Sequence, residues 1–226
     1  MPLIVSGGDG TLFLHLQQLR PPYPEVVIVP KGRGNALARD LAREPAPVAI
    51  DLLEARVQPA SGAIYTRLCA SSISFGYPTT VTRRALWFRR LRRLSYAAAS
   101  LFTLPAGLDI SIAFDDAPAA TRRLTGVLVN NTRHVGGFVA LPRASCSDGL
   151  ADCMELSAGF VPQLAHHLSA MSGLHIYCPT RITQFRHAVL SPSVPQPLML
   201  DGELLPPAAR VEIRVLPAAL RCSVAR

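Results

Sequence analysis

The 226-residue chain has few cysteines, and their arrangement excludes two common ways of stabilising a small protein. Their number is odd, and none of them forms a C-x-x-C pair. Neither a disulfide framework nor a zinc site is therefore indicated. We expect a protein of a reducing compartment, the cytoplasm. The five cysteines are Cys69, Cys146, Cys153, Cys178 and Cys222.

The chain also lacks an apolar run suited to crossing a membrane, and it lacks a basic-then-apolar export signal at its amino terminus. The longest stretch without a charged residue, 156–180, is interrupted by Pro162, Gln163, His166 and His167. Such a segment is not typical of a transmembrane helix. We expect a soluble protein that touches membranes at their surface without crossing them.

Acidic residues are in short supply. There are 15 of them against 23 basic residues, which gives a net charge of +8 and a pI of about 9.8. This imbalance favours an anionic partner, such as a nucleotide, an acidic membrane surface or a nucleic acid. The apolar share of 49% is enough for a folded core.

The first fifty residues alternate between strand and helix patterns. A short apolar run at 3–5 precedes a helical pattern at 12–19, and "VVIV" at 26–29 precedes the helix pattern of "GRGNALARDLA". This order predicts a parallel sheet with ligand-binding loops at the carboxyl ends of its strands. We assign residues 1–52 to an α/β domain.

The pattern changes at "REPAPVAIDLLEARVQPASG", where prolines, small residues and Asp51 indicate a crossing into a second domain, residues 53–226. Short alternating runs follow, and they predict a mostly antiparallel β-sandwich or barrel. These runs lie at 63–74, 108–114, 124–130, 154–157, 182–190, 198–200 and 211–215.

Both helices of the first domain follow loops that contain glycine. "SGGDGTL" is compatible with an Asp-Gly hairpin turn, or with a bare backbone loop that presents N–H groups to an anion. In the second case Thr11 caps the helix or turns its hydroxyl toward the anion. "PKGRGNALARDL" is compatible with a helix capped by Asn35, with Lys31, Arg33 and Arg39 in solvent. Because parallel strands end at one sheet edge, the two loops are predicted to converge on one ligand.

Four motifs, taken in order, resemble a known family. They are "SGGDGTL", "VPKGRGNALAR", "VNNTRHVGGFVALPRASCSDGLADCMEL" and "LDGELL". In order and approximate spacing they resemble the catalytic domain shared by diacylglycerol, sphingosine and ceramide kinases, over almost the whole chain. "GNALA" and "DGELLPPAARVEIRVLP" are more similar to the sphingoid-base and ceramide branch. The first motif alone is shared with NAD kinases.

This resemblance implies a lipid kinase that uses ATP and Mg²⁺, with an α/β nucleotide-binding domain, a β-rich lipid-binding domain, and ATP in the cleft between them. The expected catalytic residues are Asp9, Asp201 and Glu203, with Asp9 or Asp201 accepting the proton of the lipid hydroxyl. The two loops are expected to hold ATP through Gly7, Gly8, Asp9, Gly10, Thr11, Lys31, Gly32, Arg33, Gly34 and Asn35.

Two acids are the expected ligands of Mg²⁺. This ion prefers oxygen ligands and keeps several waters, so scattered carboxylates from different loops are adequate, and we expect Asp148 and Asp201 to bind it. Each of these residues is followed by glycine, which is also typical of a plain β-turn.

The segment "RRALWFRRLRRLSYAAASLFTL" predicts a cationic amphipathic helix. Trp87, Leu91, Leu94 and Ala98 recur on one face, whereas the arginines lie on the other. One interpretation is that the part between Arg83 and Arg93 docks on an anionic membrane surface. The other is a surface helix packed on the core through its apolar face. Nucleic acid is not an expected partner, because interleaved exposed aromatics are missing. Nothing in the sequence indicates an oligomeric state.

The chain departs from the family pattern at several points. Arg33 replaces the usual threonine or serine, and Pro78, Thr79 and Thr80 lie where many relatives place an aspartate near the lipid head group. The strand-helix-strand segment that usually precedes the first glycine loop is missing from the sequence. We therefore keep two alternatives, a catalytically inactive lipid- or nucleotide-binding paralogue and, third, an NAD kinase.

Overall fold

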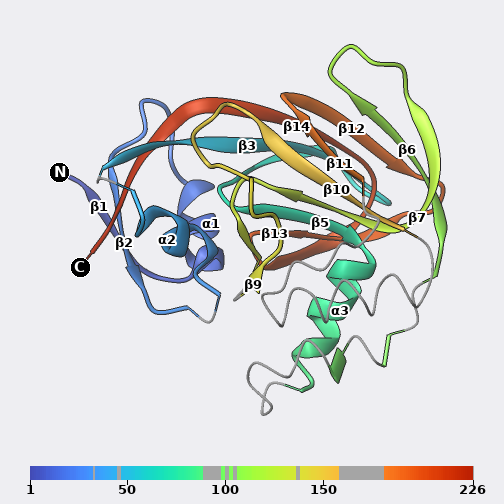
Figure 1. Cartoon of the computed structure of the whole chain (residues 1–226), viewed down its shortest axis with the longest axis horizontal. Helices are drawn as coiled ribbons and strands as arrows, with labels where there is room; N and C mark the ends of the chain where they lie inside the picture. Colours follow the sequence, from blue (N-terminus) through green and yellow to red (C-terminus); the bar gives the residue numbers. More distant parts are fainter. Residues whose placement is uncertain are drawn as a thin grey trace.

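The computed structural model describes residues 1–32, 34–44, 47–88, 98–99, 102–103, 106–135, 138–157 and 181–225. A small part built from β1, β2, α1 and α2 joins a larger part made of long strands (Figure 1). The end of β14 returns to the small part, so both chain termini lie at the same end of the molecule (Figure 1). The helix α3 extends beside β5 and β13.

The small part is the parallel sheet that the sequence predicts. The strands β1 (Leu3–Gly7) and β2 (Val26–Pro30) pair in parallel, and each is followed by a helix, α1 (Asp9–Leu16) or α2 (Ala36–Leu41). α1 begins earlier than the apolar pattern indicated, since Gly8 is its N-cap. Buried side chains from both strands and both helices form one apolar cluster, which includes Val5, Leu12, Leu16, Val26, Ile28, Leu37 and Leu41.

The larger part is predominantly antiparallel. Its strands are β3 (Val48–Pro59), β4 (Tyr65–Cys69), β5 (Ser72–Gly76), β6 (Leu108–Phe114), β7 (Ala120–Asn130), β10 (Ala151–Ser157), β11 (Arg181–Phe185), β12 (His187–Pro192), β13 (Gln196–Leu200) and β14 (Glu203–Val224). β8 (His134–Val135) and β9 (Phe138–Val139) form a separate short pair. The predicted run at 108–114 coincides with β6, whereas the runs at 63–74 and 182–190 each split into two strands.

Six of these strands close into a barrel. The pairings run from β14 to β12, β6, β7, β5 and β13, and from β13 back to β14. The main apolar cluster contains Phe75 of β5 and Phe185 of β11, both fully buried, and the ring centroid of Phe114 lies 5.4 Å from that of Phe185. This confirms the β-rich architecture predicted for the second half of the chain.

The strands β3 and β14 join the two parts of the molecule. They pair along most of the length of β3, and the end of β14 then pairs in parallel with β2. The predicted boundary between residues 52 and 53 therefore falls inside β3. We interpreted this segment as a crossing because prolines border it, but its buried residues Ile50, Leu52, Ala55 and Val57 are core strand positions.

Asp51 is a buried connector that the sequence pattern did not reveal. Its carboxylate accepts hydrogen bonds from the N–H groups of Gly149 and Ala218, each at 2.7 Å. Ala218 lies in an irregular part of β14 and has a positive φ of 48°. Because both donors are backbone groups of bends that lack ladder partners, Asp51 supplies the acceptors that these bends need.

The third helix, α3 (Tyr77–Ala85), follows β5 directly and packs on β5, β7 and β13. Its buried side of Tyr77, Val81 and Ala85 lies against Ala99. Within the described ranges, no helix is both long and apolar enough to cross a membrane.

Phe75→Ala tests the importance of the barrel interior. Removing this fully buried ring should lower the free energy of unfolding by about 3–5 kcal/mol, because the cavity cannot be refilled. Urea denaturation followed by circular dichroism measures the change. Phe102→Ala is the matched control, since Phe102 is 68% exposed and should lose less than about 1 kcal/mol. Equal losses for the two variants would contradict this description of the core.

Candidate functional site

The first glycine loop connects β1 to α1. Gly8 has extended backbone angles and caps the helix, and the Leu12 N–H donates to the Gly8 carbonyl at 3.1 Å. A Cβ on Gly7 would lie 2.5 Å from the Cβ of Thr11, so the Thr11 side chain occupies the space beside this glycine. The hairpin interpretation of Asp9-Gly10 is therefore wrong, because these residues begin a helix.

The second loop connects β2 to α2 and is closed by Asn35. This residue has a left-handed conformation, with φ of 50°. Its Oδ1 accepts a hydrogen bond from the Gly32 N–H at 2.9 Å, and its Nδ2 donates to the Gly32 carbonyl at 2.8 Å. The Asn35 side chain therefore braces the loop instead of capping α2. Arg33 lies outside the described residues.

The two loops meet backbone to backbone. A Cβ on Gly8 would lie 2.9 Å from the Cα of Gly32, and a Cβ on Gly32 would collide with the Cα of Gly8. The Lys31 N–H also donates to the Gly7 carbonyl at 2.9 Å, although the Lys31 side chain is exposed. Side chains are thus excluded where the loops touch, and the two loops converge as predicted.

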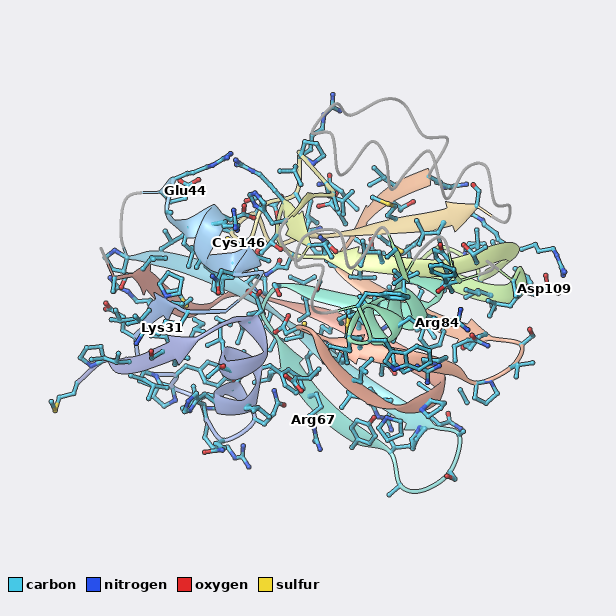
Figure 2. All side chains as sticks on the ribbon, turned by 90° about the horizontal axis from the view of Figure 1, so that it is seen from below. Lys31, Glu44, Arg67, Arg84, Asp109 and Cys146 are labelled. Carbon is cyan, nitrogen blue, oxygen red and sulfur yellow. The ribbon has the colours of Figure 1, made fainter. Side chains whose placement is uncertain are left out.

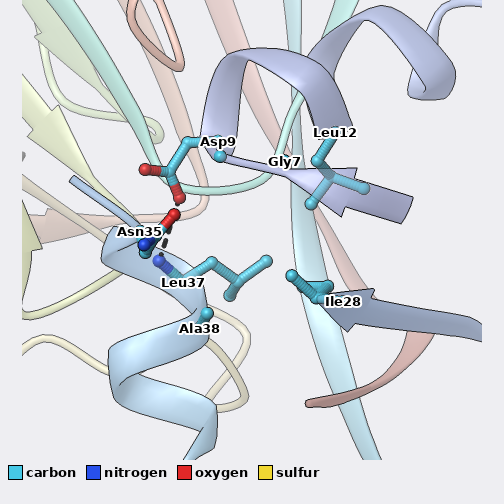
Figure 3. A pocket seen from close by; sticks show the side chains of 8 residues that line it. Gly7, Asp9, Leu12, Ile28, Asn35, Leu37 and Ala38 are labelled. Carbon is cyan, nitrogen blue, oxygen red and sulfur yellow. Dashed lines mark hydrogen bonds between the residues drawn. The ribbon is translucent and has the colours of Figure 1, made fainter. Parts of the chain in front are cut away.

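Asp9 binds the start of the second helix. Its carboxylate accepts hydrogen bonds from the N–H groups of Ala36 at 2.9 Å and Leu37 at 3.1 Å (Figure 3). Burial raises the pKa of Asp9, the two helix amides act in the opposite direction, and the charge of Asp201 raises it further. Asp9 therefore caps α2 from another loop, and it occupies amides that could otherwise face a phosphate.

A pocket lies between the two loops. Its apolar floor is made by Leu12, Ile28 and Leu37, whose side chains point toward one another (Figure 3). Gly7, Gly8, Asp9, Asn35 and Ala38 complete its lining. The enclosed space that a water-sized group can occupy amounts to about 10 Å³, which is room for roughly one water molecule.

Asp201 is buried in the turn between β13 and β14. Asp201 and Gly202 have positive φ angles of 48° and 90°, as in a type I′ hairpin turn. Within the described residues its carboxylate, whose residue is 2% exposed, accepts five hydrogen bonds. The donors are the N–H groups of Ala70, Ser71 and Ser72, the Ser71 hydroxyl and the Cys69 thiol.

Four of these five donors converge on Oδ1 of Asp201, and only the Ala70 N–H binds Oδ2. The donors come from the turn between β4 and β5, so the carboxylate connects this turn to the turn between β13 and β14. The catalytic and metal-binding roles that we expected for Asp201 stay predictions.

Glu203 lies over the first glycine loop. A Cβ on Gly10 would collide with Oε1 of Glu203, so the carboxylate lies against this glycine. The residue is exposed, and among the described residues neither a hydrogen bond nor an ion pair engages it. Of the three predicted catalytic acids, it has the most accessible carboxylate.

Asp148 does not complete a metal site with these acids. It is exposed, and its Oδ1 accepts a hydrogen bond from the Leu150 N–H at 3.0 Å, which is a local turn. In the part of the chain that the structure describes, no three His, Cys, Asp or Glu side chains are grouped so that they could hold a metal ion. The assignment of Mg²⁺ to Asp148 and Asp201 stays a prediction.

A buried pair that the motifs did not indicate holds the other end of α2. Asp40 Oδ1 lies 2.6 Å from Nδ1 of His134, and Asp40 Oδ2 accepts a hydrogen bond from the Arg133 N–H at 2.6 Å. Asp40 and His134 are both buried. α2 is therefore tied at its start by Asp9 and at its end by Asp40. The separation of 94 residues between Asp40 and His134 explains why no local pattern revealed the pair.

Comparison with protein families finds two matches in this chain. The diacylglycerol kinase catalytic domain matches residues 1–63, and the YegS C-terminal NAD kinase beta sandwich-like domain matches residues 71–224. The second match covers more than half of the chain. The sphingosine and ceramide kinase branch stays a prediction.

Solved structures share the fold. A crystal structure of a diacylglycerol kinase from Bacillus anthracis str. Sterne has a TM-score of 0.74 and 18% identity, over 98% of this chain and 76% of that chain. Yeast NADH kinase complexed with NADH has a TM-score of 0.55 and 12% identity, over 99% of this chain and 60% of that chain. Comparison with curated proteins finds no match. The chain belongs to the family defined by the YegS C-terminal NAD kinase beta sandwich-like domain, and its first 63 residues match the diacylglycerol kinase catalytic domain.

Proposed function

We propose that this chain is an ATP-dependent lipid kinase that phosphorylates the hydroxyl group of a sphingoid base, ceramide or diacylglycerol. The observation that carries the proposal is the contact between the two glycine loops. No side chain lies at the contact, between Gly8 and Gly32, and the exposed carboxylate of Glu203 lies beside it, over Gly10. Phosphoryl transfer chiefly requires such positioning of a polyphosphate, together with a group that accepts the alcohol proton. The proposed location is the cytoplasm, at the surface of a membrane.

We assign the phosphates to the first loop. The first-turn amides of any helix lack intrahelical acceptors, and in α1 they include those of Gly10 and Thr11. The corresponding amides of Ala36 and Leu37 in α2 already donate to Asp9. The second loop then acts as the opposing wall, with the Lys31 side chain available as a positive charge. Of the residues predicted to bind ATP, those of the first loop are therefore the ones assigned to the phosphates. Gly32, Gly34 and Asn35 of the second loop face them.

We assign proton acceptance to Glu203. The Glu203 side chain is exposed, lies over Gly10, and is not engaged within the described residues. Asp9, in contrast, caps α2, and Asp201 is buried and already accepts five hydrogen bonds. A carboxylate is an adequate base, because the proton moves as the oxygen attacks the phosphorus. Mg²⁺ that accompanies ATP takes most of its ligands from phosphate oxygens and water. The proposal therefore needs no site built from Asp148 and Asp201.

The alternative, a paralogue that binds nucleotide or lipid without turnover, is favoured by two observations. The pocket between the loops is small, and two of the three acids already have structural partners. An assay that separates binding from transfer distinguishes the two functions.

The experiment that tests the proposal is transfer of labelled phosphate from ATP. The purified protein is incubated with Mg²⁺, labelled ATP and a panel of acceptors that comprises sphingosine, ceramide, diacylglycerol and, for the NAD kinase alternative, NAD⁺. We expect label in a lipid product and none in the nucleotide acceptor. ATP binding by the folded protein without transfer to any lipid would instead support the inactive paralogue.

Glu203→Gln tests the assignment of the proton acceptor. The amide keeps the shape of the side chain but cannot take a proton, so kcat should fall by about 10²–10⁴, whereas KM for ATP should change little. Steady-state kinetics measures both constants. Glu44→Gln, at another exposed glutamate, is the matched control and should retain full activity. A Glu203→Gln enzyme with an unchanged kcat would rule out this role.

Asp201→Asn tests the structural role of the buried acid. The amide nitrogen of asparagine would face N–H donors that now bind the carboxylate, and it would leave some of them unpaired. We expect the free energy of unfolding to fall by about 2–4 kcal/mol, measured by chemical denaturation. If stability were unchanged and only turnover were lost, Asp201 would be a catalytic acid and the structural assignment would fail.

A further inference from the structure

The turn that follows α3 presents an apolar surface that the barrel does not use. α3 packs through Tyr77, Val81 and Ala85, which recur every fourth residue. This buried side differs from the one that the sequence predicted, which contained Trp87. Trp87 is 78% exposed, so the interpretation in which it packs this segment on the core is wrong. Leu91 and Leu94 of the predicted face lie outside the described residues.

Other large apolar side chains lie beside Trp87. Leu86 is 48% exposed and Phe102 is 68% exposed. The half-buried ring of Phe88 stacks on that of Phe102, with 5.7 Å between the ring centroids. Leu86, Trp87 and Phe88 follow one another in the turn after α3, and the stacking places Phe102 next to Phe88, so the four residues belong to one region of the surface. We call Leu86, Trp87, Phe88 and Phe102 the α3 patch.

Arginines accompany this patch. Arg83 is exposed one turn before Trp87, and Nη1 of Arg84 donates hydrogen bonds to the Phe102 carbonyl at 2.5 Å and the Thr103 hydroxyl at 3.2 Å. Arg84 therefore holds residues 102 and 103 against the end of α3 and fixes the position of the Phe102 backbone. Arg84 and Lys31 lie well apart (Figure 2), so this charge is separate from that of the second glycine loop.

We propose that the α3 patch docks the protein on the surface of an anionic lipid bilayer. Tryptophan, phenylalanine and leucine with adjacent arginines suit the interface, where rings enter the acyl boundary and guanidinium groups meet phosphates. The net charge of +8 complements such a surface. A second copy of the chain is a poorer occupant, because it brings the same positive charge to the contact.

The position of the patch suits the function proposed above, on which this inference rests. α3 packs on β5 and β13, and Figure 1 shows it projecting beside these strands. β5 carries Ser72, which binds Asp201, and β13 leads into the turn that precedes Glu203. Docking through α3 therefore places the layer in which a lipid substrate resides beside β5 and β13. The acids lie at the ends of these strands that are away from α3, since Leu200 pairs with Ile73 and α3 begins after Gly76.

The single tryptophan makes the test direct. Trp87 is the only tryptophan in the chain, so intrinsic fluorescence reports this position alone. The intact protein is titrated, without ATP, with vesicles of phosphatidylcholine or of equal parts phosphatidylcholine and phosphatidylglycerol. We expect a blue shift of the emission and protection from acrylamide with the anionic vesicles, weakened by high salt.

Variants of the patch separate its apolar and charged contributions, with co-sedimentation as the readout. Phe102→Ser should weaken binding to anionic vesicles by about tenfold through lost apolar burial. Arg83→Gln should weaken it by about fivefold, only at low salt. Val194→Ser is the matched control, because Val194 is 59% exposed between β12 and β13 and is not part of the α3 patch, and this variant should bind within about twofold of the parent.

Several results would overturn the proposal. They are an unchanged Trp87 emission with vesicles, vesicle binding that Phe102→Ser and Val194→Ser weaken equally, and a blue shift that depends on protein concentration alone. Neither vesicle lipid is a proposed substrate, so this outcome is independent of turnover. If the protein phosphorylated detergent-dispersed lipid but did not bind vesicles, the docking surface would be refuted and the proposed function would stand.

Discussion

The backbone contact between Gly8 and Gly32 is the constraint on which the candidate site depends. Only glycine permits the two loops to approach this closely, since a Cβ on either residue would meet the Cα of the other. The contact puts the start of α1 beside the start of α2, within reach of the Asp9 carboxylate. The depth and width of the pocket follow from this arrangement, and so does the position of Glu203 above Gly10.

Buried carboxylates connect the elements around this contact. Asp9, Asp51 and Asp201 each accept hydrogen bonds from backbone amides of distant segments. An ionised carboxylate is suited to this role because it only accepts, and because its charge strengthens each bond. Burial disfavours the ionised form of a carboxylate, and it raises the pKa of Asp9 for this reason. Asp9 and Asp201, which we expected to be catalytic acids, thus also hold the loops in position. A catalytic role is therefore easier to assign to Glu203 than to these two residues.

Local patterns predicted the parts of this structure whose partners are near in sequence. The apolar runs before the glycine loops gave a parallel β1–β2 pair, and the alternation at 108–114 coincides with β6. β3 was missed because flanking prolines obscured its alternation of buried residues. The burial of Asp201 depends on donors about 130 positions away, and the tie between Asp40 and His134 spans 94. Such contacts leave no periodic signal. The exposure of Trp87 likewise follows from which side of α3 the barrel covers.

The central claim is that these two loops hold the polyphosphate of ATP. Hydrogen–deuterium exchange of the intact protein, with and without a non-hydrolysable ATP analogue and Mg²⁺, tests it most directly because it reads backbone amides. We expect the analogue to slow exchange at residues 7–11, whose amides are assigned to the phosphates, with no comparable change in β6 or β12. Slowed exchange confined to other segments, with the glycine loops unaffected by bound analogue, would contradict it.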